Sequence, residues 1–115
     1  MRSLGTAWLA GALPAWVRAQ RPVPSFSIAG SGPTILTYGR EPSFFAPLTS
    51  RYRVVRLSYD IDDVSTPDEV CADLLAAADA AGASRFVWYG YSISAVAGLQ
   101  LATRTDRLTA LICGG

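Results

Sequence analysis

Short apolar runs separated by turn-forming residues recur along the chain from position 21 onward. Residues 34–38 are apolar or β-branched throughout, which is the pattern of a strand buried on both faces. Residues 23–28 begin beside two prolines and alternate only weakly, which indicates a short edge strand. Further runs of this kind predict strands at residues 52–59, 85–89 and 108–113.

Segments with helical spacing of apolar residues separate these strands. Thr66 is a good helix cap, Pro67 suits the first helical position, and Glu69 completes a capping box. Apolar residues then recur at helical spacing as far as Gly82, which predicts the end of the helix. We also expect helices at residues 44–49 and 94–103.

The alternation of strands and helices predicts an α/β fold with a mostly parallel sheet and crossover helices. No repeat or linker interrupts residues 21–115, so we expect a single domain there. We interpret residues 1–20 as an N-terminal extension. Residues 1–19 have a signal-like apolar pattern with a poor cleavage site, so we favour a cytoplasmic protein over a secreted one. The run is too short to span a membrane.

Composition excludes several classes of function. All ten positive residues are scattered arginines, so there is no basic stripe for nucleic acid and no lysine for Schiff-base or P-loop chemistry. No histidine is present to act as base or metal ligand. We interpret acidic residues 60–65 as a solvated loop rather than a cation site, and expect no metal or other cofactor. Cys71 and Cys113 are predicted to be buried, unpaired thiols.

One motif carries candidate chemistry. Gly90-Tyr91-Ser92-Ile93-Ser94 lies between a predicted strand and a predicted helix. Small residues on both sides of a serine permit a turn sharp enough to push its hydroxyl out above a sheet. Ser94 stands where the G-x-S-x-G pattern has its second glycine, and we expect it to add strain. The alternative is an ordinary strand–turn–helix junction.

From about residue 28 to residue 115 the chain resembles the α/β-hydrolase superfamily. Residues 29–39 resemble the family's entry into its oxyanion-hole strand, residues 92–102 its elbow helix, and residues 104–112 the segment that leads into the next strand. The resemblance implies an incomplete α/β-hydrolase fold. It is specific to the superfamily and to no particular substrate.

The resemblance also implies roles for individual residues. Ser92 would be the nucleophile of an acyl transfer, and the backbone N–H groups of Ile93 and Arg40 would form the oxyanion hole. Gly39 would give this loop room and, with Tyr91, would line the pocket for a small ester or acyl substrate. The alternative for Gly39 and Arg40 is an ordinary loop that ends a strand.

The chain departs from the family in two respects. Tyr38 stands where the family usually has a histidine, which affects loop support rather than the reaction. The acidic and histidine members of the triad follow the serine along the chain in this family, so we expect both beyond Gly115. We therefore interpret the chain as an N-terminal portion that is inactive by itself. The outer edge of residues 108–113 would then be open to association with another chain.

Two other functions are alternatives to hydrolysis. A non-catalytic relic or binding module would have kept the scaffold and lost the base, and the missing histidine favours it. A dinucleotide-binding domain would rest on Gly30-Ser31-Gly32. That motif lacks its third glycine and precedes a predicted strand instead of a helix, so we set this function aside.

Overall fold

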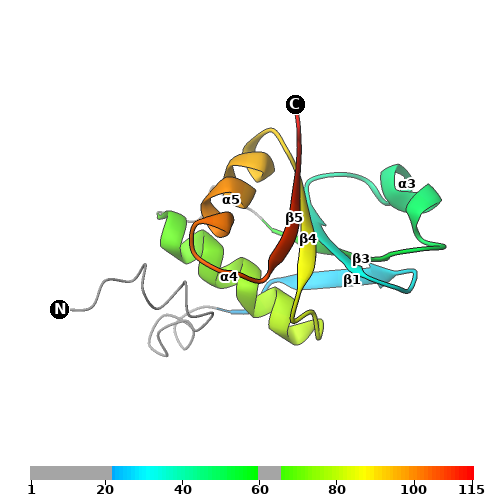
Figure 1. Cartoon of the computed structure of the whole chain (residues 1–115), viewed down its shortest axis with the longest axis horizontal. Coiled ribbons are helices and arrows are strands. Elements are labelled where there is room, and N and C mark those ends of the chain that lie inside the picture. Colours follow the sequence, from blue (N-terminus) through cyan, green and yellow to red (C-terminus); the bar gives the residue numbers. More distant parts are fainter. Residues whose placement is uncertain (1–21, 60–65) are drawn as a thin grey trace.

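A computed structural model of the chain describes residues 22–59 and 66–115. Within these residues one five-stranded sheet is flanked by three α-helices and a 3₁₀ turn (Figure 1). The strands are β1 (Ser25–Ala29), β2 (Thr34–Tyr38), β3 (Arg53–Ser58), β4 (Phe86–Tyr91) and β5 (Leu108–Gly114). The helices are α3 (Pro42–Phe45), α4 (Pro67–Ala80) and α5 (Ile93–Ala102), and the 3₁₀ turn is η1 (Ala46–Leu48).

The strands lie in the order β1-β3-β2-β4-β5. β1 pairs with β3 in antiparallel fashion, and the other pairings are parallel, so the mostly parallel sheet is confirmed. β2 is central and buried along its whole length, as its apolar run predicts. β1 is an edge strand, also as predicted, and β5 forms the other edge.

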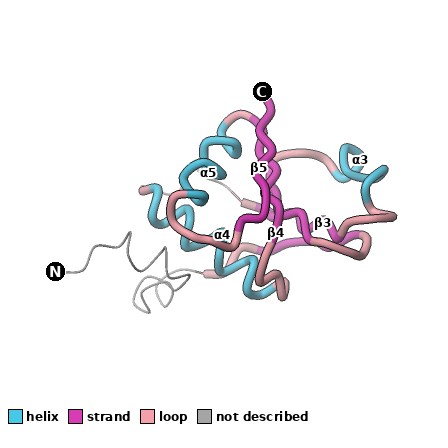
Figure 2. The backbone as a smooth tube through the Cα atoms, viewed as in Figure 1, coloured by secondary structure: helices cyan, strands magenta, loops and turns pink. Residues whose placement is uncertain are grey.

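The two faces of the sheet carry different layers. Figures 1 and 2 show α4 and α5 on one side of β4 and β5, and α3 on the other. Leu36 and Trp88 point into the larger core beneath α4 and α5. Ile35 and Val87 point to the opposite face, where they pack with Phe45 of α3. Side-chain alternation along the strands therefore sorts the apolar residues into two layers.

Helix α4 begins where its capping residues predict. The Thr66 hydroxyl accepts a hydrogen bond from the Glu69 N–H at 3.1 Å, and Pro67 is the first helical residue. The guanidinium of Arg104, which follows α5, donates to the Asp68 carboxylate at 2.8 Å. This ion pair ties the end of α5 to the first turn of α4.

The region after β2 differs from the prediction of one helix at residues 44–49. α3 begins earlier, at Pro42, because proline is suited to the first turn of a helix. The helix does not continue as a single α-helix, since Pro47 has no N–H to donate, and the 3₁₀ turn η1 follows instead. Phe44 is thereby placed within α3 and not at its start.

The two cysteines also differ from one another. Cys71 on α4 is buried, as predicted, and burial raises the pKa of its thiol to about 12, an effect that Arg104 opposes and Asp68 reinforces. The prediction that Cys113 is buried is wrong, because β5 is an edge strand and Cys113 lies exposed on it.

Helix α5 rests very closely on β4. A Cβ atom at Gly98 would lie 2.6 Å from Nε1 of Trp88, so only glycine allows this approach. The Trp88 indole N–H donates to the Ser94 carbonyl oxygen at 2.9 Å. Together these contacts hold the first turns of α5 against the end of β4.

Some sequence predictions fall outside the described residues. They are the N-terminal extension at residues 1–20, with its signal-like pattern, and the acidic loop at residues 60–65. In the part that the structure describes, no helix is both long and apolar enough to cross a bilayer. The cytoplasmic location stays a prediction. Nor do three His, Cys, Asp or Glu side chains gather there as a metal site. Gly30 and Gly32 lead into β2 and not into a helix, as the sequence predicts.

Candidate active site

The carboxyl ends of β2 and β4 lie side by side at the centre of the sheet. From β2 the chain leaves toward β3 on one side, and from β4 it leaves toward β5 on the other. In open α/β sheets such a divergence leaves a crevice at the carboxyl ends of the strands, and ligands bind there. The topology therefore places a candidate site at Gly39 and Ser92, which follow these two strands.

Ser92 forms the turn between β4 and α5 in an unusual backbone conformation. Its φ is 57° and its ψ is −118°, and it is the one non-glycine residue with positive φ in the described ranges. A side-chain-bearing residue held in such a region costs roughly 1–3 kcal/mol. Ser92 is also exposed, so its side chain lies above the end of the sheet. The sharp strand-to-helix turn expected from the motif is therefore present.

The small residues on either side of Ser92 hold this turn. A Cβ atom at Gly90 would lie 2.5 Å from the carbonyl carbon of Ser94, so a larger residue would push α5 away from β4. Ser94 is buried, and its hydroxyl accepts from the Tyr91 N–H at 2.7 Å and donates to the Tyr91 carbonyl at 2.9 Å. We expected Ser94 to add strain to the turn, but its backbone does not have a positive φ. Instead, its hydroxyl closes the turn.

The end of β5 supports the turn from the other side. The Ser92 N–H donates to the Gly114 carbonyl at 3.0 Å. A Cβ atom at Gly115 would lie 2.9 Å from the Ser92 nitrogen, so the chain passes very close to the serine backbone here. The main chain of Ser92 is thus held in place while its side chain remains accessible.

The two proposed oxyanion donors lie on α5 and on the loop after β2. Ile93 is the first residue of α5, so its N–H has no acceptor within the helix. Gly39 has φ +94°, and a Cβ atom there would lie 4.0 Å from Oγ of Ser94, so this loop runs beside the first turn of α5. The Arg40 carbonyl accepts two hydrogen bonds from the Arg56 guanidinium, at 3.0 and 3.2 Å. These bonds fix the loop that carries the Arg40 N–H.

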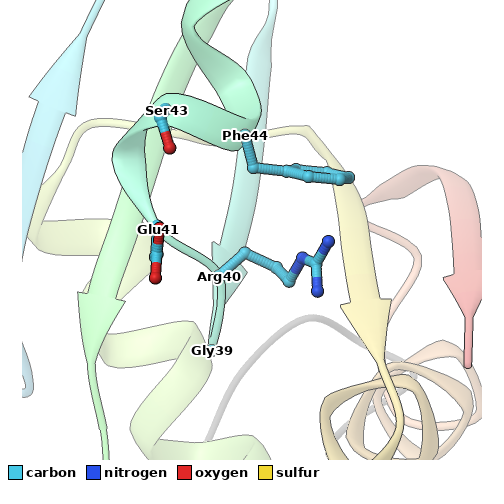
Figure 3. A pocket seen from close by; sticks show the side chains of 5 residues that line it. All are labelled: Gly39, Arg40, Glu41, Ser43 and Phe44. Carbon is cyan, nitrogen blue, oxygen red and sulfur yellow. The ribbon is translucent and has the colours of Figure 1, made fainter.

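The Arg40 side chain contacts two aromatic rings. Its guanidinium carbon is 4.2 Å from the centre of the Phe44 ring and 4.7 Å from that of Tyr91. Figure 3 shows the Arg40 and Phe44 side chains extending next to each other toward β4. Beside them is a cavity of about 430 Å³, lined by Gly39, Arg40, Glu41, Ser43 and Phe44.

The structure thus brings the predicted site residues into two groups. Arg40 and Tyr91 are in contact, and Gly39 and Arg40 line the cavity. Ser92 and Ile93 stand on the turn next to Tyr91 and do not line the cavity.

Sequence reasoning missed two residues that shape this site, Phe44 and Arg56. Arg56 offered a signal, because an arginine inside an apolar strand needs hydrogen-bond acceptors. Phe44 offered none, since its contact with Arg40 depends on where α3 begins.

Tyr38, the last residue of β2, supports the loop by packing. Its ring meets those of Tyr59 and Trp88 edge-on, at centroid distances of 5.5 and 5.8 Å. Its hydroxyl is buried without a hydrogen-bond partner in the described residues. Burial raises the pKa of Tyr38 to about 12, because a buried phenolate would lose its hydration. Tyr38 is therefore neutral at ordinary pH.

The described part of the site has a candidate nucleophile and candidate oxyanion donors but no histidine to act as a base. The chain contains no histidine, and no hydrogen bond joins the Ser92 hydroxyl to a carboxylate within residues 22–59 and 66–115. Comparison of the chain with protein-family models and with curated proteins finds no match. The interpretation of the site therefore depends on the geometry described above.

The strain at Ser92 can be measured by substitution. We expect Ser92→Gly to be more stable than Ser92→Ala by about 1 kcal/mol or more, because glycine adopts a positive φ without steric cost. Urea denaturation of both variants gives the difference. The control is Ala76→Gly in the middle of α4, where glycine should be the less stable residue by about 1 kcal/mol. An alanine variant at position 92 as stable as the glycine variant would show that the turn is unstrained.

The buried hydroxyl of Tyr38, which has no hydrogen-bond partner in the described residues, predicts that folding stability depends on pH. The unfolded chain loses this proton near pH 10 and the folded chain near pH 12, so stability falls as pH rises through this interval. We expect Tyr38→Phe to raise the free energy of unfolding by about 1 kcal/mol at neutral pH and to reduce the alkaline loss. Urea denaturation at about pH 7 and about pH 11 measures both effects. Tyr52→Phe, on the other face of the sheet, is the control. A less stable Tyr38→Phe variant would reveal a partner for the hydroxyl.

Proposed function

We propose that the chain carries the nucleophile and the oxyanion donors of an α/β-hydrolase-type serine hydrolase. The observation that supports this most directly is the backbone of Ser92, with φ 57° and ψ −118° between β4 and α5. A serine on a sharp, strained strand-to-helix turn above a sheet is the nucleophile elbow of that superfamily. The position of Ser92, where the connections from β2 and β4 diverge, adds independent support.

The chemistry proposed for this site is acyl transfer to a small ester or acyl substrate. Oγ of Ser92 attacks the substrate carbonyl carbon, and negative charge develops on the carbonyl oxygen as the tetrahedral intermediate forms. The N–H groups of Ile93 and Arg40 donate to that oxygen. The N-terminal end of α5 adds a positive potential in the same region.

The Ser92 proton needs an acceptor that these residues do not supply, because the chain contains no histidine. In the superfamily, the acid and the histidine follow the serine along the chain. Loss of a triad member costs on the order of a million-fold in rate, and roughly a thousand-fold of catalysis over water remains. We therefore propose that the chain is inactive by itself. A non-catalytic relic or binding module is the second candidate, and the missing base favours it.

Covalent labelling separates these two functions. An activated ester, 4-nitrophenyl acetate, with imidazole as an external base, should acetylate Ser92. Once imidazole is removed by desalting, the acetyl group should persist, because the chain has no histidine to activate water for its removal. Peptide mass spectrometry should find it on Ser92 in preference to the exposed Ser25 and Ser43. In Ser92→Ala the labelling at this peptide should disappear.

The same ester without imidazole measures turnover by the chain alone. Steady release of 4-nitrophenol by the wild-type chain should equal that of Ser92→Ala. Steady release that depends on Ser92 would show that the chain has its own base, contrary to our proposal. Labelling of Ser92 no faster than that of Ser25 and Ser43 would favour the non-catalytic relic.

We further propose that two copies of the chain associate along β5. β5 is an edge strand, so one row of its backbone N–H and C=O groups faces away from the sheet. Large apolar side chains have about half or more of their surface exposed on β5 and on α5, which packs against β5, namely Ile112 on β5 and Ile93, Val96 and Leu99 on α5. An open strand edge beside exposed apolar side chains favours pairing with another chain.

Analytical ultracentrifugation tests this association. The mean mass of the wild-type chain should rise with concentration. Ile112→Lys should weaken the association, because it places a charge on the edge strand. Val23→Lys is the matched control, since Val23 is similarly exposed near the opposite edge of the sheet. A wild-type chain that stays monomeric at all concentrations would contradict the proposal.

A further inference from the structure

We propose that the acyl substrate carries a carboxylate, remote from the reacting carbonyl, and that the guanidinium of Arg40 binds it. The inference that this carboxylate belongs to an acyl substrate rests on the proposed hydrolase function. The binding of an anion depends only on the surroundings of Arg40. The two steps can therefore be tested apart.

The Arg40 guanidinium is held in place but has no hydrogen-bond acceptor. The rings of Phe44 and Tyr91 lie 4.2 and 4.7 Å from its central carbon. Its Nε is buried without a partner, and its side chain makes no hydrogen bond or ion pair within residues 22–59 and 66–115. A guanidinium carries five N–H donors, and a buried donor without an acceptor is unfavourable. A bound anion would supply the missing acceptors.

The other partly buried arginines of the described residues all have oxygen acceptors, unlike Arg40. Arg53 donates to the Ala81 carbonyl and to Thr34. Arg56 donates to a backbone carbonyl, and Arg104 and Arg107 each donate to a carboxylate. Each of these four guanidinium groups thus stabilises the fold through oxygen acceptors. Arg40 lies at the candidate site, and within the part of the chain that the structure describes its guanidinium contacts two rings and has no oxygen acceptor.

The location of Arg40 connects the anion site to the nucleophile. Tyr91, whose ring lies against the guanidinium, directly precedes Ser92 in the chain. The backbone N–H of Arg40 is also a proposed oxyanion donor. An acyl group with its carbonyl at Ser92 would therefore extend its far end toward the guanidinium. The adjoining cavity of about 430 Å³ is large enough for a small acyl chain.

The chemistry of the guanidinium favours a carboxylate. Its planar fork pairs with a carboxylate through two parallel hydrogen bonds, which an ammonium group cannot reproduce. The aromatic rings offer no oxygen acceptor to its N–H groups, so these donors remain available to an anion. Glu41 also lines the cavity but forms no ion pair with Arg40, and Figure 3 shows its side chain apart from the side chains of Arg40 and Phe44.

A binding experiment tests the anion site alone. Adipate and its neutral dimethyl ester are titrated into the labelled protein, and backbone amide shifts are followed by NMR. Adipate should shift the amides of Gly39, Arg40 and Tyr91, and the dimethyl ester should not. Arg40→Gln should weaken adipate binding by roughly tenfold or more, whereas Arg40→Lys should recover only part of the loss. Equal binding of adipate to the wild type and to Arg40→Gln would overturn the inference.

The matched control for charge is Arg85→Gln. Arg85 is exposed just before β4, at the end of this strand opposite Tyr91. Its replacement lowers the net charge by the same amount as Arg40→Gln and should leave adipate binding unchanged. An equal loss of binding in both variants would show a general charge effect and would also overturn the inference.

An acylation experiment connects the anion site to the proposed chemistry. Mono(4-nitrophenyl) adipate should acylate Ser92 faster than the neutral 4-nitrophenyl hexanoate, and Arg40→Gln should abolish this preference. Equal rates with the two esters in the wild type would overturn the inference and leave the proposed hydrolase function standing. Failure of both esters to label Ser92 would count against the proposed function, and the NMR titration would still decide whether Arg40 binds an anion.

Discussion

The sharp reversal of the backbone at Ser92 is the constraint around which the site is arranged. The turn holds a side-chain-bearing residue at φ 57°, which costs roughly 1–3 kcal/mol and must be offset by its surroundings. Gly90 lets α5 approach, the Ser94 hydroxyl bonds the Tyr91 backbone, and the Gly114 carbonyl accepts the Ser92 N–H. Contacts from β4, α5 and β5 thus converge on one residue.

The two faces of the sheet make different contributions. The face beneath α4 and α5 holds most of the core, and Trp88 on this face anchors the first turn of α5. The opposite face holds a smaller apolar cluster and the Arg40 side chain, which contacts the Phe44 ring. The first side of the sheet therefore stabilises the turn, and the second borders the space that we propose for the substrate. In the proposed reaction, proton transfer is the one function that these residues do not supply.

Features that depend on neighbours in the sequence could be predicted without the structure. The cap at Thr66 and the burial of β2 follow from local residue types, because capping bonds span three residues and strand burial is visible in an apolar run. The turn at Ser92 is of the same kind, since the small residues two positions before and after it permit the sharp reversal. The α/β class and the mostly parallel sheet followed from the order of such segments.

Tertiary structure decided the rest, because the residues concerned are far apart in the chain. Arg40 and Tyr91 meet only because β2 and β4 are neighbours in the sheet, and pairing register determines which side chains share a face. Cys113 is exposed because β5 lies at an edge, which its apolar sequence does not reveal. The sequence alone thus determined the turn that presents the Ser92 hydroxyl. The packing of strands and helices decided what stands beside it, because contacts between distant residues depend on strand order and not on local conformation.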